Sequence, residues 1–164
     1  GVFRMTNIHI ICVGKLKEPF YAQAVAEYTK RLSPYCRLTI TELSEEKLPD
    51  RPSQAQIDAA LRKEAAAIRS KLPPRARVVA LCVEGQLLSS PELAKRLRTW
   101  EVGPTNQLCF LIGGSYGLDE ALKQEAQVRL SMSPMTFPHH LFRVMLLEQL
   151  YRGFKINEGS SYHK

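Results

Sequence analysis

Residues 107–138 have the sequence QLCFLIGGSYGLDEALKQEAQVRLSMSPMTFP, in which strand-like and helix-like segments alternate. Residues 107–112 predict a strand, in which every residue after Gln107 is apolar. A glycine-rich turn at 113–117 follows, then a predicted helix at 118–126 and a second predicted strand at 128–132. This order predicts a βαβ unit, in which a helix joins two parallel strands.

The same alternation continues on both sides of this segment. Apolar or alternating runs predict strands at 7–13, 36–43 and 77–83. Helical spacing of apolar residues, with serine and proline at the boundaries, predicts helices at 18–33, 54–72, 89–100 and 139–156. The whole pattern predicts an α/β fold, a mostly parallel sheet of about five strands with helices on both faces. We expect residues 5–164 to form one domain, and residues 1–4, which precede Met5, to be a remnant of expression.

Composition narrows the function classes. The chain has 23 Lys and Arg against 16 Asp and Glu, a formal charge of +7, which favours an anionic partner such as RNA, DNA or a nucleotide. No apolar run reaches the length of about 20 residues that a membrane helix needs, and no signal peptide is visible, so we expect a cytoplasmic protein. The four cysteines and four histidines lack metal-ligand spacing, and the absence of a GxSxG motif gives a hydrolase little support.

Ligands of parallel α/β sheets bind outside the carboxyl ends of the strands. We therefore expect the chemistry in the loops that follow strands 77–83, 107–112 and 128–132. Gly113 and Gly114 allow the backbone to approach a ligand closely, although a plain tight turn uses the same residues. The loop at 133–138 could present backbone polar groups to the edge of an adenine, with Met and Phe on its faces, or it could be an ordinary core connection.

The last predicted helix is apolar on almost every side, which predicts that it is buried on every side and packs against a second subunit. Within it, Arg143, Glu148 and Arg152 are charged residues in apolar surroundings. Glu148 and Arg152 are four residues apart and are expected to form an ion pair. Arg143 lies near the helix start, where a guanidinium could hold a phosphate or stabilise an anionic base, unless it too forms a structural ion pair.

Several segments together resemble the RlmH family of SPOUT methyltransferases. They are VGKLK at 13–17, EYTKRLSPY at 27–35, FLIGGSYGL at 110–118, LSMSPMTFPH at 130–139, RV at 143–144, EQLYR at 148–152 and YHK at 162–164. The resemblance implies a SPOUT fold with a C-terminal trefoil knot and a homodimer. It also implies S-adenosyl-L-methionine (SAM) as methyl donor, no metal, and N3-methylation of a pseudouridine in 23S ribosomal RNA (rRNA) within the ribosome.

The resemblance also implies the roles of individual residues. Arg143, Tyr162 and His163 match positions that face the target base, with the C-terminal tail serving the partner subunit's site. We hypothesise that Arg143 supplies positive charge and that His163 or water accepts the proton. The SAM pocket falls on Leu81, Gly113, Gly114, Met132, Ser133, Pro134, Met135, Thr136 and Phe137. Candidate phosphate contacts, which are equally well explained as solvated surface, are Lys15, Lys17, Lys30 and Arg31.

Two other functions remain open at this point. The first is a ribosome-binding factor that keeps this fold without catalysis. The second is a nucleotide-binding α/β module of flavodoxin type. SAM binding and a flavin spectrum would separate these alternatives from a methyltransferase.

Overall fold

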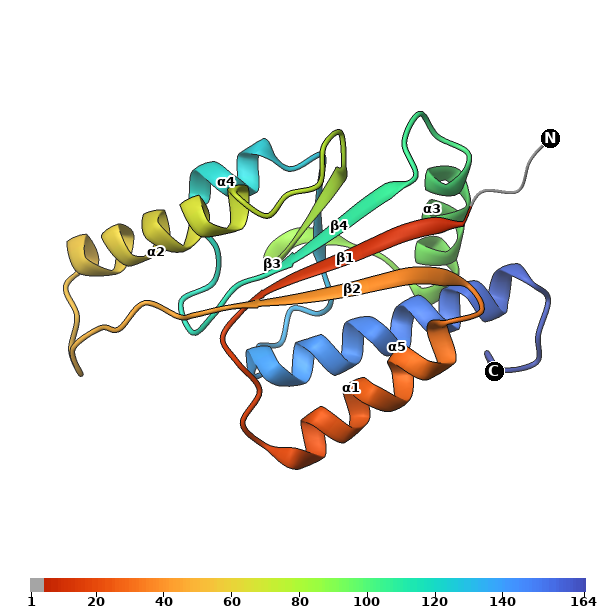
Figure 1. The fold of residues 1–164 in the computed structure, drawn as a ribbon, viewed down its shortest axis with the longest axis horizontal. Coiled ribbons are helices and arrows are strands. Elements are labelled where there is room, and N and C mark those ends of the chain that lie inside the picture. The colour runs from red at the N-terminus through yellow and green to blue at the C-terminus, as the bar shows by residue number, and fades with distance from the viewer. Residues whose placement is uncertain (1–4) are drawn as a thin grey trace.

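Five parallel strands form one sheet, and helices cover both of its faces (Figure 1). The computed structural model describes residues 5–164, so the expectation for residues 1–4 lies outside the described residues. The predicted α/β class is confirmed, with all five strands and five helices close to their predicted positions. The strands are β1 (Thr6–Val13), β2 (Cys36–Leu43), β3 (Arg77–Leu87), β4 (Gln107–Ile112) and β5 (Val128–Ser131). The helices are α1 (Pro19–Leu32), α2 (Gln54–Arg69), α3 (Ser90–Glu101), α4 (Glu120–Glu125) and α5 (His139–Asn157).

The strand order across the sheet is β2-β1-β4-β3-β5. The fourth strand in sequence therefore lies at the centre, paired with β1 on one side and β3 on the other. Strands β4, β3 and β5 are consecutive in the sheet and parallel, so the loops that follow them leave the same edge next to one another. This arrangement brings together three segments that are well separated in sequence.

Each face of the sheet has its own apolar core, because successive side chains of a strand point to opposite faces. Ile8, Ile10 and Phe110 pack with α1, α3 and α5 on one face. Ile11 and Leu111 pack with α2 and α4 on the other. Burial on both faces explains why the central strand β4 is apolar after Gln107, whereas the edge strand β2 alternates between apolar and polar residues.

Serine caps start two of the helices as the sequence predicts. The Ser53 side chain accepts a hydrogen bond from the backbone N–H of Gln56, whose own side chain accepts from the Ser53 N–H. Ser89 and Glu92 form the same reciprocal capping box at the start of α3. Each box satisfies backbone donors that a helix N-terminus leaves free.

Strand β3 is longer than predicted, and the expectation that it ends at residue 83 was wrong. Its pairing with Leu130 shifts from Leu81 to Gln86, so the chain between them bulges out of the ladder before pairing resumes. Glu84 and Gly85 within this bulge resemble a strand end in sequence. Gly85 is required there, because an added Cβ would lie 2.8 Å from the backbone of Arg129 and Leu130. Residues 82–85 therefore lie outside the regular pairing with β5.

Helix α5 lies on the sheet between α1 and α3 (Figure 1). These neighbours bury Leu146, Leu147 and Leu150 completely. Only part of the prediction that α5 is buried all round is met within one chain, because the side pointing away from the sheet stays half-buried. Within residues 5–164, no helix is long and apolar enough to cross a membrane. The predicted threading of the C-terminal segment stays a prediction.

Candidate functional site

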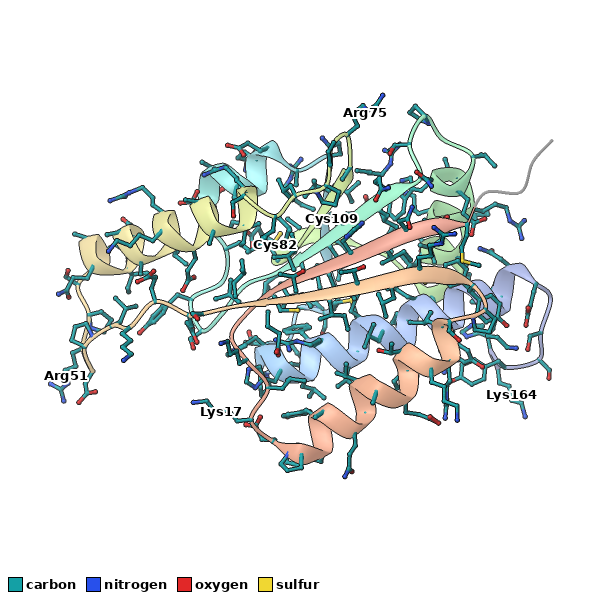
Figure 2. The ribbon with its side chains drawn as sticks, in the orientation of Figure 1. Lys17, Arg51, Arg75, Cys82, Cys109 and Lys164 are labelled. Atoms are coloured by element: carbon teal, nitrogen blue, oxygen red, sulfur yellow. The ribbon has the colours of Figure 1, made fainter. Side chains whose placement is uncertain are left out.

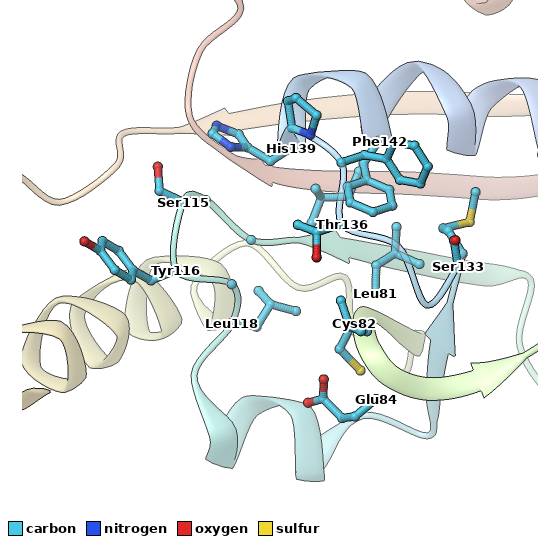
Figure 3. Close-up of a pocket in the computed structure, with 18 of the residues that line it drawn as sticks. Leu81, Cys82, Glu84, Ser115, Tyr116, Leu118, Ser133, Thr136, His139 and Phe142 are labelled. Carbon is cyan, nitrogen blue, oxygen red and sulfur yellow. The ribbon is translucent and has the colours of Figure 1, made fainter.

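A cavity of about 620 Å³ lies beside the bulge in β3 and the carboxyl ends of β4 and β5 (Figure 3). This volume is within the range of about 300–1,000 Å³ that small-molecule sites occupy. The bulge in β3, the loop after β4 and the loop after β5 each supply one part of the wall. The start of α5 closes the remaining side. The position agrees with the rule that α/β sheets bind ligands at this edge.

The first wall is the bulge after Leu81, with Cys82, Val83 and Glu84. The Glu84 carboxylate forms an ion pair with Lys123 of α4, whose side chain is 14% exposed. Hydrogen bonding to this ammonium lowers the pKa of Glu84, so the carboxylate is charged at neutral pH. Burial acts to lower the pKa of Lys123, but its hydrogen bonds to Glu84 and Glu120 outweigh burial and raise it. The cavity thus has a charged rim beside an apolar interior.

The second wall is the glycine-rich loop after β4. The N–H of Gly117 donates to the carbonyl of Gly114 at 3.0 Å, and Gly117 has a φ of 80°, a conformation that favours glycine. An added Cβ on Gly113 would lie 2.3 Å from the Gly117 carbonyl group. Outside the loop, the Glu45 carboxylate accepts a hydrogen bond from the Ser115 N–H at 2.6 Å. The loop is therefore a rigid turn, fixed from within and from the segment after β2.

The third wall is the connection from β5 to α5. The Ser131 hydroxyl donates to the carbonyl of Ser133 at 3.1 Å, and the Ser133 hydroxyl accepts from the Met135 N–H at 3.0 Å. These side-chain bonds fix the backbone without using a regular element. Phe137 packs edge to face on Phe142 of α5, with ring centroids 5.6 Å apart, and both rings line the cavity. A planar apolar ligand would meet a preformed aromatic wall here.

His139 lines the same cavity at the first position of α5. Burial lowers its pKa, and the neighbouring His140 and Arg143 lower it further. The imidazole is therefore neutral at physiological pH. Its ring packs over Gly14, where an added Cβ would lie 3.2 Å from Nε2.

The structure brings most of the predicted SAM-binding residues to this cavity. Pro134 and Met135 are exceptions, since neither lines it and Met135 is 71% exposed. The predicted residues that do line the cavity are Leu81, Gly113, Gly114, Met132, Ser133, Thr136 and Phe137.

The three residues expected to face the target base lie elsewhere in the single chain. Arg143 is only 1% exposed, and its guanidinium donates to the Glu42 carboxylate and to the Gly14 carbonyl. The expectation that it points at a ligand is thus not met in one chain, because a nearby carboxylate pairs with it. Tyr162 and His163 contact the outer side of α5 instead of the cavity.

Sequence reasoning missed several residues of the site. The expectation of a regular strand up to residue 83 left out the bulge that places residues 82–84 in the wall. Lys123 and Phe142 come from neighbouring helices, and only the packing of those helices places them in the wall. Glu45 carries no sequence signal, because its role depends on a contact with Ser115, 70 residues away. Among residues 5–164, His, Cys, Asp and Glu side chains form no group of three that could hold a metal ion.

The fold and the cavity define a parallel α/β protein with a small-molecule site built from three consecutive strand-end loops. The family described as "Predicted SPOUT methyltransferase" matches residues 6–163. The ribosomal RNA large subunit methyltransferase H of Bacillus pumilus is 47% identical over 158 residues, covering 96% of this chain and 99% of that protein. The protein of the same name from Moorella thermoacetica is 45% identical over 160 residues, covering 98% and 100%. The chain therefore belongs to the SPOUT methyltransferases, and within them to the RlmH family of these relatives.

A solved structure supports the fold independently. It is that of a "probable methylase family protein" from Haemophilus influenzae, which is 13% identical to this chain. The two superimpose with a TM-score of 0.52, covering 94% of this chain and 67% of the other. At this identity the likeness concerns the fold alone.

Proposed function

We propose that this protein transfers a methyl group from SAM to N3 of a pseudouridine in 23S rRNA of the ribosome. The observation that carries the proposal is the cavity formed jointly by the bulge in β3 and the loops after β4 and β5. The family supports methyl transfer, and the names of the close relatives support large-subunit rRNA as the acceptor. The charge of +7 suits an RNA partner.

The cavity has the chemistry that SAM requires. Leu81, Phe137 and Phe142 offer apolar surface for an adenine, and the rigid backbone of residues 132–136 offers polar groups for its edge. The Glu84 carboxylate suits ribose hydroxyls or an ammonium group. When bound there, SAM supplies an activated methyl on a sulfonium, so the protein needs neither a metal nor a covalent nucleophile.

The task of the protein is then to orient the acceptor and to manage its proton. Alignment of two reactants lowers the activation barrier by up to about 7–11 kcal/mol. N3 of pseudouridine must lose a proton, for which His163 of the tail or a water molecule is our candidate acceptor. Tyr162 is proposed to contact the target base beside it.

Arg143 keeps a role in this proposal, but through a different geometry. Its charge is balanced by Glu42, and its two hydrogen bonds join α5 to the ends of β1 and β2. We infer that Arg143 mainly positions the start of α5, including His139. The guanidinium does not line the cavity, so its positive charge acts on the acceptor only from a distance.

A second copy of the chain is proposed to complete the site. The half-buried residues on the outer side of α5 recur every three or four positions, so they form one continuous stripe. A hollow lined by Leu88, Met132 and Met145 lies beside this stripe. An antiparallel helix pair centred on Met145 would bring Glu148 level with the partner's Phe142. The tail of one copy would then lie near the cavity of the other. The outer residues of α5 are Leu141, Val144, Met145, Glu148 and Arg152.

The experiment combines binding with product mapping. Calorimetry should show SAM binding to the purified protein, sedimentation should show a dimer, and nucleoside mass mapping should show N3-methylated pseudouridine after incubation with ribosomes. SAM binding without transfer would instead indicate a non-catalytic ribosome-binding factor. No SAM binding together with a flavin spectrum would indicate the flavodoxin-type alternative.

A further inference from the structure

The C-terminal tail is bound to the outer side of α5 by four side chains, which we call the tail clamp: Glu148, Arg152, Tyr162 and His163. The Tyr162 hydroxyl donates to Glu148 Oε1 at 2.9 Å. Arg152 Nη1 donates to His163 Nδ1 at 3.1 Å. Two segments that are otherwise separated by a turn are thereby fixed to each other.

The helix side of the clamp is itself rigid. Arg152 binds Glu148 through two hydrogen bonds, from Nη2 at 2.9 Å and from Nε at 3.2 Å. Such paired contacts fix both side chains in one geometry, as single contacts do not. The guanidinium also lies over the Tyr162 ring, 4.7 Å from its centroid, and Tyr151 packs edge to face on that ring at 5.0 Å. The Glu148–Arg152 pair therefore binds both tail side chains: Glu148 accepts from Tyr162, and Arg152 donates to His163.

The clamp holds the tail away from the cavity of its own chain. Glu148 and Arg152 lie six and ten residues after Phe142, the α5 residue farthest along the helix that lines the cavity. At 1.5 Å per residue these separations are about 9 and 15 Å along the helix axis. Tyr162 and His163 are therefore ordered at a fixed distance from the cavity, on the side of α5 that is open to a second copy.

We propose that Glu148 and Arg152 are positioning residues that order Tyr162 and His163 before the acceptor binds, so that the tail is presented preformed to the partner's cavity. This inference rests on the proposed function. An unclamped tail would have to be ordered during each encounter, which lowers the fraction of productive complexes. Neither positioning residue touches SAM or the acceptor in this proposal.

The test uses the full-length protein and four variants. Glu148→Gln removes the charge at nearly constant shape, Arg152→Lys keeps the charge and loses the paired contact, and Tyr162→Phe loses only the hydroxyl. Glu125→Gln is the matched control, since Glu125 also pairs with an arginine, Arg69, but touches no tail residue. The first measurement is the rate at which a carboxypeptidase releases the last three residues from the folded protein. The second is the SAM dissociation constant by calorimetry, and the third is kcat for methyl transfer to ribosomes.

We expect all three clamp variants to release the tail about tenfold faster, as the loss of a hydrogen bond worth about 1.4 kcal/mol would allow. SAM affinity should stay within about twofold, while kcat should fall about tenfold to a hundredfold, the range for misplaced groups. The control should match the original protein in every measurement. If a substitution on α5 impairs folding, the tail-release rate of Tyr162→Phe still tests the clamp; its kcat does not, because Tyr162 is itself proposed to contact the target base.

Two results would overturn the inference. Unchanged tail release in Glu148→Gln and Arg152→Lys would show that these residues do not hold the tail. Faster release with normal kcat would show that the order of the tail is irrelevant to transfer. If the original protein itself transfers no methyl group, the proposed function fails, and the release rates still decide whether the clamp exists.

Discussion

Arg143 of α5 and Glu42 of β2 are joined by an ion pair although 101 residues separate them in sequence. The guanidinium also donates to the Gly14 carbonyl at 3.0 Å, so three elements meet at one side chain. Arg143 is among the most deeply buried large side chains described. The pair therefore joins the sheet to helix α5, whose start closes the cavity.

Removal of the Glu42 carboxylate should destabilise the protein strongly. Glu42→Ala leaves the buried Arg143 charge without its partner. Breaking a fully buried pair costs about 3–5 kcal/mol, and we expect the lower end, about 3 kcal/mol, because the Glu42 side chain is 35% exposed. The free energy of unfolding, measured in urea at one protein concentration, should fall by that amount. Glu27→Ala is the control, because Glu27 and Arg31 form an exposed pair that contributes less than about 1 kcal/mol. Equal losses of unfolding free energy in the two variants would show that the Arg143–Glu42 pair does not hold α5 to the sheet.

The same pair predicts a pH dependence. Burial acts to raise the pKa of Glu42, but hydrogen bonds from the Leu16 N–H and from Arg143 outweigh it and hold the pKa below its ordinary 4.5. A carboxylate whose pKa is lowered by folding stabilises the protein above 4.5 and loses this contribution as the pH falls through the folded-state pKa. The stability difference between the original protein and Glu42→Gln should be constant from pH 7 to pH 5 and should shrink below about 4.5. A difference that grows on acidification would reverse the sign and refute the assignment.

The glycine-rich loop should tolerate no side chain at its first position. In Gly113→Ala the new methyl group would meet the Gly117 backbone at 2.3 Å, which the loop can relieve only by moving. We expect SAM affinity to fall by about tenfold or more, because the loss of one hydrogen bond worth about 1.4 kcal/mol has that effect on a dissociation constant. Gly103→Ala serves as the control, because its nearest contact is at 3.4 Å and it lies outside the cavity lining. Calorimetry on both variants, with circular dichroism to verify folding, makes the comparison.

Cys82 should report on cavity occupancy. It lines the cavity and is half-buried, whereas Cys12, Cys36 and Cys109 are buried (Cys82 and Cys109 are labelled in Figure 2). Burial raises the pKa of the Cys82 thiol, and the Glu84 charge raises it further, so alkylation should be slow at pH 7 and accelerate toward pH 10. SAM should slow the reaction of Cys82 in proportion to occupancy, as mass spectrometry of the labelled peptide can show. Labelling that ignores saturating SAM would place the cofactor elsewhere.

The basic residues before α1 should contribute to ribosome binding. Lys15 and Lys17 are exposed, and Figure 2 shows Lys17 pointing away from the body of the molecule. If both contact phosphates, Lys15→Ala with Lys17→Ala should weaken ribosome binding and reduce the slope of log affinity against log salt by about 2. SAM affinity should not change. A pair of substitutions at Lys63 and Lys71, exposed residues in and after α2, provides the control for net charge.

The main architecture could be predicted because each strand carries its burial in its own sequence. The runs at 78–83 and 108–112 are apolar throughout, which is the pattern of strands in the interior of a helix-covered parallel sheet. The rule that ligands bind at the carboxyl ends of parallel strands then predicts a site in the loops that follow residues 83, 112 and 132. The bulge in β3 escaped this reasoning, because Glu84-Gly85-Gln86 looks like the end of a strand and only the Leu130 ladder shows that pairing resumes.

The polar contacts of the site could not be predicted in the same way. Glu45, Glu84 and Lys123 act through partners that are 39 to 70 residues distant, and no local pattern encodes such pairing. For Arg143 the sequence left a ligand contact and a structural pair open, and the structure shows the pair with Glu42. The Glu148–Arg152 pair was predicted from spacing alone and is confirmed. Its contacts with the tail required the structure.

The central position of β4 has a consequence for how the chain assembles. Strand β1 cannot be enclosed until residues 107–112 arrive to pair with it, about a hundred residues after it is made. Pairings between such distant segments are slow to form, because the intervening chain must first be brought to order. The first half of the polypeptide should therefore wait as an incomplete sheet. All three loops of the cavity follow residue 80, so competence for chemistry should be the last property that the folding chain acquires.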